Sequence, residues 1–179
     1  MSRRASRELR TIDTYPPEIT LREGRDRYLA ENGFTMGTYP EEWTRIPVMF
    51  GIHATLPSPL QRRQALPMHD FHHVVTGYGT DLAGEAEISA WEVSRGLGSV
   101  GPYVKTLILT GYLQGMILRP RRTRLARRAA PGQGSLFGRL AEYDALLART
   151  VGDVRRELGL PEAGLVSTRG LHDDAPAPT

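Results

Sequence analysis

The sequence predicts an all-α fold: a single compact multi-helix domain with a metal site between two adjacent helices. Three observations support this prediction. Apolar residues recur at the three- and four-residue spacing of amphipathic helices, whereas no strand-like alternation persists along the 179 residues. A hydrophobic content of 40% is enough to build a core. Two histidines and an aspartate share one segment at helical spacing, and a glutamate follows in the next expected helix.

The composition excludes several classes of function. The chain has no cysteine, which excludes disulfides, zinc ribbons, thiolate catalysis and iron–sulfur ligation, so His, Asp or Glu must hold any metal. Lys105 is the single lysine among 23 basic residues, but the net charge is only +3. This small surplus, together with 7% aromatic residues, argues against a nucleic-acid partner.

Length and composition predict one domain with frayed ends. We expect residues 1–20 to form a flexible N-terminal arm, residues 21–160 a single all-helical domain, and residues 161–179 a disordered C-terminal tail. The basic N-terminus lacks the apolar run of a secretory signal, so a cytoplasmic location is expected.

Proline and glycine set the limits of the first expected helices. One helix is predicted over residues 21–34 and is closed by Gly33. A short second helix is predicted over residues 40–45, because a proline at its first position and two glutamates suit a first turn.

The next helix is expected after Ser58, because Ser58 and Gln61 have the spacing of a capping box. Pro67 should interrupt it and begin or kink a helix over residues 68–75. With Pro67 at the first helical position, His69 would lie in the first turn, where the helix dipole favours the neutral, metal-binding imidazole.

Three further helical segments complete the expected domain. Asp81 is placed to cap a helix over residues 82–95. Residues 100–118 are the longest apolar stretch, and its proline, lysine, glutamine and glycines indicate a buried helix rather than a membrane span. Residues 135–158 carry apolar residues at the spacing of one long amphipathic helix.

The segment His69-Asp70-Phe71-His72-His73 carries the clearest chemical signal. At 100° per residue, the side chains of His69, Asp70 and His73 fall within an arc of about 100° on a helix. Glu85 follows a glycine-containing turn and opens the next helix, so an antiparallel hairpin of helices would bring it to the same point. Two nitrogens and two carboxylate oxygens suit Zn²⁺, Fe²⁺ or Mn²⁺ and do not choose among them.

The sequence also suggests positions for other residues near this motif. His72 lies about 60° to the other side of His69, where it would support a ligand, carry a proton or lie at the surface, and the surface position is favoured. Trp91 and Glu92 are expected in the core and at the rim of the domain. Gly84 and the other glycines of the turn would let the two helices approach closely.

The pattern His69-Asp70-x-x-His73, eleven residues and Glu85 resembles the signature of the coenzyme Q (ubiquinone) biosynthesis protein four family. The neighbouring residues also resemble that family over residues 66–103, and the short chain resembles a bacterial-type member. The resemblance implies a metal-dependent, all-α protein on a membrane surface. It implies removal of the ring C1 carboxyl of a polyprenylated 4-hydroxybenzoate-type precursor, coupled to hydroxylation at that carbon. The ligands it implies are His69, Asp70, His73 and Glu85.

Three functions are compatible with this motif. The first is a metal-dependent oxidative decarboxylase or lyase of quinone biosynthesis. The second is a non-catalytic scaffold that binds a prenylated aromatic lipid and docks other quinone-biosynthesis enzymes around a structural metal. The third, a His-Asp metal phosphohydrolase, would have to recruit His53 and Asp144 and would leave Glu85 unused, so it is disfavoured.

Two segments indicate partners. Arg119–Arg128 contains six arginines in ten residues and suits an anionic membrane surface, such as the inner face of a bacterial membrane, or a plain solvated face. Gly111 and Gly115 form a small-x-x-x-small step that lets another helix or an isoprenoid chain lie close. An exposed apolar helix would favour a homodimer or a membrane surface.

Overall fold

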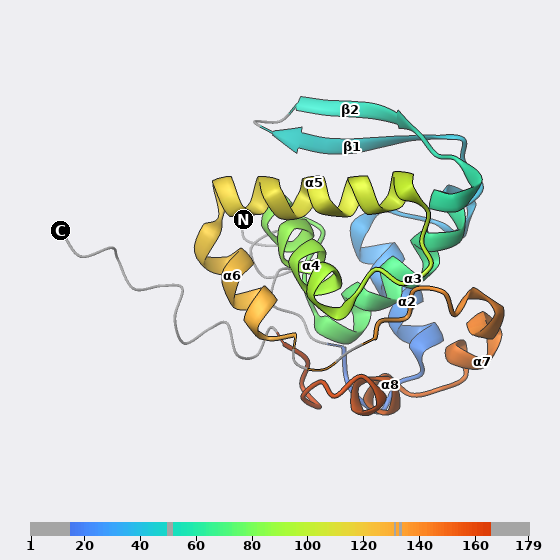
Figure 1. Cartoon of the computed structure of the whole chain (residues 1–179). Helices are drawn as coiled ribbons and strands as arrows, with labels where there is room; N and C mark the ends of the chain where they lie inside the picture. Colours follow the sequence, from blue (N-terminus) through green and yellow to red (C-terminus); the bar gives the residue numbers. More distant parts are fainter. Residues whose placement is uncertain (1–14, 50–51, 131, 133, 166–179) are drawn as a thin grey trace, which may run out of the picture.

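The structure is a computed structural model that describes residues 15–49, 52–130, 132 and 134–165. This part of the chain is mostly helical, which confirms the predicted all-α class (Figure 1). A two-stranded hairpin and two short 3-10 helices, η1 and η2, accompany seven α-helices. In chain order the elements are α2 (Leu21–Asn32), η1 (Met36–Thr38), β1 (Trp43–Met49), β2 (Ile52–Pro57), α3 (Leu60–Thr76), α4 (Leu82–Arg95), α5 (Pro102–Leu118), α6 (Pro120–Arg128), η2 (Leu140–Glu142), α7 (Tyr143–Leu147) and α8 (Val151–Glu157).

The limits of α2 and α4 agree with the sequence because local capping sets them. Thr20 and Glu23 form a reciprocal capping box at the start of α2, and Gly33 ends that helix in the left-handed conformation at φ 73°. Asp81 accepts a hydrogen bond of 2.7 Å from the Gly84 amide at the start of α4. These signals need only neighbouring residues, so the sequence alone reveals them.

Helix α3 continues through Pro67, so of the two predicted roles the one in which Pro67 begins a helix is wrong. The Ser58 capping box is also wrong: Pro59 precedes the first turn without a side-chain cap, and the Ser58 hydroxyl accepts from Arg62 Nη1 at 3.0 Å. His69 therefore lies in the middle of a 17-residue helix, and the helix-dipole argument does not apply to it.

Strands β1 and β2 pair as an antiparallel hairpin, and β1 begins where a short helix over 40–45 was predicted. Trp43 pairs with Pro57 and Arg45 with Thr55. Tryptophan, threonine, isoleucine and valine favour extended backbone, and Pro47 cannot continue a helix, which explains the outcome. The Tyr103 hydroxyl of α5 donates to the Pro57 carbonyl at 2.6 Å, and the hairpin lies along α5 in Figure 1.

The single long helix predicted over residues 135–158 is divided into η2, α7 and α8. Gly138 adopts φ 87°, and Thr150 begins α8 with its own side-chain cap while bridging to Thr20. Most of the apolar positions are nevertheless buried, including Leu136, Leu146 and Val154. The hydrophobic pattern was therefore a sound guide to the core but not to the length of the helix.

Helix α5 was predicted to be buried, and the structure shows that it is only half so. Val104 and Ile108 face the core, whereas Leu113 is 59% and Ile117 79% exposed. Gly115 allows close packing on α4, because a Cβ there would lie 2.4 Å from the Ala86 Cβ. Within the described residues, no helix combines the length and the apolar character needed to cross a membrane.

Helices α3 and α4 cross the centre of the core, where Phe71, Ile88 and Trp91 are fully buried. The described ends of the predicted arm and tail pack against this centre: Tyr15 and Leu165 are buried, and the Leu165 amide donates to the Thr76 carbonyl at 2.9 Å. Residues 1–14 and 166–179 lie outside the described residues.

Arg155 of α8 is fully buried and caps the C-terminal end of α3. Its guanidinium donates to the carbonyls of Val74, Val75, Tyr15 and Glu162 at 2.7–3.3 Å. Carbonyls at a helix end have no partner within the helix, so Arg155 supplies hydrogen bonds that α3 itself cannot.

We predict that Arg155→Met lowers the free energy of unfolding by about 2–4 kcal/mol, because several buried carbonyls lose their donors. Chemical denaturation followed by circular dichroism measures the change. Arg156→Met is the control: that side chain is 77% exposed and pairs with the exposed Asp153, so its loss should cost less than about 0.5 kcal/mol. Equal effects of the two substitutions would contradict the capping role.

Candidate metal centre

Three ligand atoms from two helices converge at one point. His69 Nε2 and His73 Nε2 are 3.2 Å apart, and each lies 3.6 Å from an oxygen of Glu85. A ligand atom from each of these residues lies within 4.8 Å of the others, which is the spacing of groups that share one metal ion. The structure thus brings His69, His73 and Glu85 together as a group that could hold a metal ion.

Helical spacing and one close approach produce this convergence. His69 and His73 are four residues apart on α3, so their rings lie one above the other, with centroids 4.7 Å apart. Glu85 lies in the first turn of α4. Gly84 packs directly on the turn between the helices, since a Cβ there would lie 2.0 Å from the Gly79 carbonyl oxygen. Gly84 therefore packs closely on the turn, and its predicted role in the approach of the two helices stays a prediction.

Hydrogen bonds fix the tautomers of both histidines. His73 Nδ1 lies 2.9 Å from the Tyr78 carbonyl oxygen, which only accepts, so Nδ1 carries the hydrogen. His69 Nδ1 lies 2.8 Å from Glu92 Oε1 and also donates. In both neutral rings the lone pair is therefore on Nε2, and both lone pairs face the point shared with Glu85.

The facing lone pairs fit a metal. At 3.2 Å two unprotonated nitrogens repel each other, and either a proton or a cation between them relieves the repulsion. Burial favours the neutral form of His69, but the carboxylates of Glu92 and Glu85 outweigh it and raise its pKa well above the usual value. Burial lowers the pKa of His73. A metal ion entering this site would replace the proton on His69.

Glu85 remains an anion in this setting. Burial would raise the pKa of Glu85, but the neighbouring His73 and His69 outweigh burial and lower that pKa. Its side chain keeps 37% exposure, so this ligand faces the opening of the site while the His73 side chain is fully buried. Two imidazoles and an ionised carboxylate form a donor set suited to Zn²⁺, Fe²⁺ or Mn²⁺.

Asp70, the fourth predicted ligand, is buried beside the cluster and hydrogen-bonded elsewhere. The Tyr39 hydroxyl donates to Asp70 Oδ2 at 2.7 Å. Burial raises the pKa of Asp70 to about 6, despite the opposing effects of His69 and Tyr39. The converging atoms come from His69, His73 and Glu85, so ligation by Asp70 stays a prediction.

The sequence suggested a surface position for His72 and a rim position for Glu92. Both predictions are wrong, because both side chains are fully buried. His72 Nδ1 donates to Glu92 Oε1 at 2.7 Å, and His72 Nε2 accepts from the Leu136 amide at 2.9 Å. Burial would raise the pKa of Glu92, but His69 and His72 outweigh it and lower that pKa to about 2. Sequence reasoning missed Glu92, although its spacing of seven residues from Glu85 was a usable signal.

A cavity of about 500 Å³ opens beside the cluster, between α2, α3, α4, α5 and β2. His69, Asp70 and Glu85 lie in its wall. Most of the remaining wall is apolar and includes Leu56, Leu66, Val104, Leu107, Ile108 and Phe137. A volume of this size accepts an organic molecule, and its apolar walls favour a hydrophobic one.

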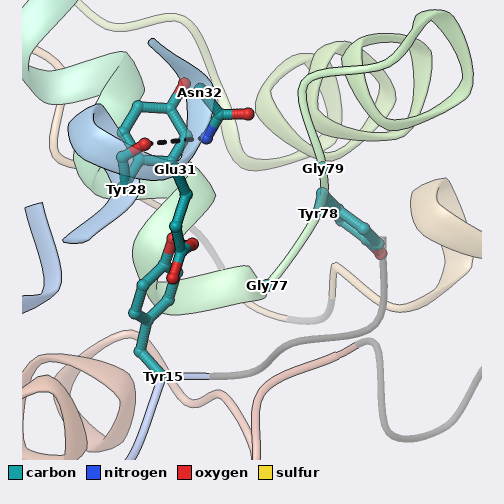
Figure 2. Close-up of a pocket in the computed structure, with 7 residues that line it drawn as sticks. All are labelled: Tyr15, Tyr28, Glu31, Asn32, Gly77, Tyr78 and Gly79. Atoms are coloured by element: carbon teal, nitrogen blue, oxygen red, sulfur yellow. Dashed lines mark hydrogen bonds between the residues drawn. The ribbon is translucent and has the colours of Figure 1, made fainter. Parts of the chain in front are cut away.

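A second cavity lies between α2 and the Gly77–Gly79 turn, lined also by Tyr15, Tyr28 and Glu31 (Figure 2). Its volume of about 20 Å³ has room for one water molecule. The Tyr28 ring stacks on His73 at 5.3 Å, and the carbonyl of Tyr78 in this turn holds His73 Nδ1. This region therefore supports the metal ligand and is too small to bind a substrate.

The other residues that the sequence singled out are Gly111, Gly115, Asp144 and His53. Gly111 and Gly115 pack against Ser89 and Ala86 of α4, so this step serves helix packing, and Gly111 also reaches the cavity wall. Asp144, which the phosphohydrolase alternative needs, is exposed on α7 and is not among the converging ligands. The side chain of His53 lies outside the described residues.

We compared the chain with protein-family models, with curated proteins and with solved structures, and none of them matches it.

We predict that Gly84→Ala weakens Zn²⁺ binding, because the added Cβ would meet the Gly79 backbone and shift the first turn of α4, and Glu85 with it, from its present position. Overpacking should also cost about 1–3 kcal/mol of stability. Gly152→Ala, which meets Pro17 at 3.0 Å on the distant α8, is the control for stability. Calorimetric Zn²⁺ titration should show weaker binding for Gly84→Ala alone; equal affinities for both variants would contradict the prediction.

Proposed function

We propose that this chain is a metal-dependent enzyme that removes the ring C1 carboxyl of a polyprenylated benzoate-type quinone precursor by oxidative decarboxylation. The observation that carries the proposal is a metal-ligand cluster at the wall of a large, mostly apolar cavity. In this reaction a benzoic acid, dioxygen and two hydrogen equivalents give a phenol, carbon dioxide and water. The reaction type comes from the resemblance of the His69-to-Glu85 motif to the ubiquinone family.

The residues of the cluster fit a divalent metal through their tautomers and their charge. His69 and His73 present unprotonated Nε2 atoms when neutral, and Glu85 adds an anionic oxygen. A bound divalent metal would supply Lewis acidity toward a carboxylate or phenolate oxygen of the substrate. Three protein ligands leave coordination positions free for such an oxygen.

Arg62 supports an acidic substrate. It lies seven residues before His69 on α3, roughly 10 Å along the helix axis, and lines the same cavity. A guanidinium in an apolar wall pairs strongly with a carboxylate because little water competes there. In the proposal, Arg62 holds the substrate anion, while the apolar walls accommodate the prenyl chain and exclude water.

A non-catalytic prenyl-lipid scaffold for a quinone biosynthetic complex is the second candidate. The apolar cavity favours it equally, because binding a prenylated aromatic lipid requires no reaction. The two candidates differ in turnover: the enzyme needs the metal to convert its substrate, whereas the scaffold retains metal and lipid unchanged.

We predict about one equivalent of a divalent transition metal per chain, measured by elemental mass spectrometry on protein purified without chelators. His73→Ala and Glu85→Gln should lower the metal affinity by more than roughly 100-fold, since loss of supporting groups alone costs 10–100-fold. Glu87→Gln is the control, because Glu87 is a buried acid of α4 that pairs with Arg122 and not with the cluster. Absence of metal from the wild type would contradict the proposed site.

The metal-loaded protein should release labelled carbon dioxide from geranylated 4-hydroxybenzoate in air with a two-electron donor present. Release that is lost in His73→Ala supports the enzyme. Metal and lipid retained without release would instead favour the scaffold. This pair of measurements separates the two candidates without assuming which metal is native.

An anionic membrane surface is the partner that we propose for the α5–α6 face. Leu109, Leu113 and Ile117 form an exposed stripe on α5, and Leu125 of α6 is 42% exposed beside the arginines. No aspartate or glutamate occurs between residues 93 and 141. Arg122 pairs with Glu87 of α4, whereas Arg121 and Arg124 are exposed beside the apolar stripe. An apolar stripe next to exposed arginines suits anionic lipid headgroups and would give access to a prenylated substrate.

We predict that the chain binds phosphatidylglycerol vesicles and that Arg121→Glu with Arg124→Glu weakens this binding roughly 30-fold, at about 1 kcal/mol per arginine. Arg22→Glu with Arg27→Glu, two exposed positions on α2, changes the net charge equally and is the control. Vesicle co-sedimentation measures both. Equal losses would indicate a general charge effect, and a dimer broken by Leu113→Asp would assign the stripe to a homodimer.

A further inference from the structure

We infer that Glu92 is a positioning residue for His69 in the metal centre and that His72 holds Glu92 in place. The inference rests on the proposed metal site. Glu92 lies seven residues after Glu85, about two turns along α4, so both acids occupy the same face of that helix. Glu85 faces the cluster directly, whereas Glu92 reaches the far side of the His69 ring.

One carboxylate oxygen determines the orientation of two imidazoles. Glu92 Oε1 accepts from His69 Nδ1 at 2.8 Å and from His72 Nδ1 at 2.7 Å. A carboxylate only accepts, so both Nδ1 atoms carry hydrogens and His69 must direct Nε2 toward His73. An anionic acceptor behind a histidine also makes its free nitrogen a better donor to a metal.

His72 is locked at both nitrogens and cannot turn away from Glu92. Its Nε2 accepts from the Leu136 amide at 2.9 Å, and its ring meets the Phe137 ring edge-to-face at 4.8 Å. All of these contacts are buried. The position of Glu92 is thus fixed by a second histidine, which does not line the cavity.

Stability alone does not account for a carboxylate at this place. Glu92 is fully buried and its Oε2 atom has no hydrogen-bond partner among the described residues, whereas stable cores rarely leave such an atom unpaired. Glu87 on the same helix shows the ordinary arrangement: both of its oxygens accept from the Arg122 guanidinium, at 3.0 and 2.8 Å. The incomplete pairing of Glu92 indicates that its charge serves the neighbouring metal ligand.

The test compares Glu92→Gln with Glu87→Gln by Co²⁺ and Zn²⁺ titration and by thermal unfolding of the metal-free proteins. Glutamine keeps the shape and an acceptor oxygen but removes the charge. We expect Glu92→Gln to raise the dissociation constant for the metal 10–100-fold and to alter the visible spectrum of bound Co²⁺. Glu87→Gln should lower the melting temperature and leave the metal affinity within twofold.

Wild-type metal affinity in Glu92→Gln, with a lower melting temperature, would assign Glu92 a structural role and overturn the inference while the metal site stands. A wild-type chain that binds no metal would overturn the proposed function and this inference together. If Glu92→Gln fails to fold, Glu92→Asp replaces it, because the shorter side chain withdraws the carboxylate from both histidines. Weaker metal binding by Glu92→Asp supports the inference, and wild-type affinity overturns it.

Discussion

The need to satisfy buried imidazoles governs the centre of this protein. Three histidines lie within five residues of one core helix, and two of them are fully buried. Each Nδ1 atom donates to an acceptor from another element: Glu92 of α4 for His69 and His72, and the Tyr78 carbonyl for His73. Because buried polar groups without partners are costly, these bonds hold α3, α4 and the turn between them in one arrangement. The same bonds leave two Nε2 atoms facing Glu85.

Charge and apolar surface are arranged differently on the two sides of this centre. On the protein side, Glu92 is buried without a full set of partners, and Arg155 closes the end of α3 with its guanidinium. On the open side, the cluster meets an apolar cavity covered by α5 and the hairpin. The candidate ligands thus lie in one wall of the cavity, and the other walls are mostly apolar. This arrangement suits the proposed hydrophobic substrate with a single reacting end.

The ligands were predictable because helical periodicity is local. His69 and His73 follow from a spacing of four, and Glu85 follows from a glycine turn that reverses the chain. Packing decided the rest of the site. Glu92 reads as an ordinary polar position until α4 is placed against α3, and His72 reads as a surface residue until Leu136, 64 residues later, supplies its second hydrogen bond. No pattern within one segment contains that information.

The sequence by itself determined the helical class, the capped limits of α2 and α4, and the apolar positions that fill the core, since each depends on near neighbours. Tertiary structure decided the conformation of three segments in which the local prediction was wrong. Helix α3 continues through Pro67 because the surrounding core holds it, and β1 and β2 pair as a hairpin along α5. The 135–158 segment breaks at Gly138 and Thr150, where the chain meets Thr20. Long-range contacts outweigh local preference in each case, because a local preference is worth about 1 kcal/mol, or about 3 kcal/mol for the proline inside α3.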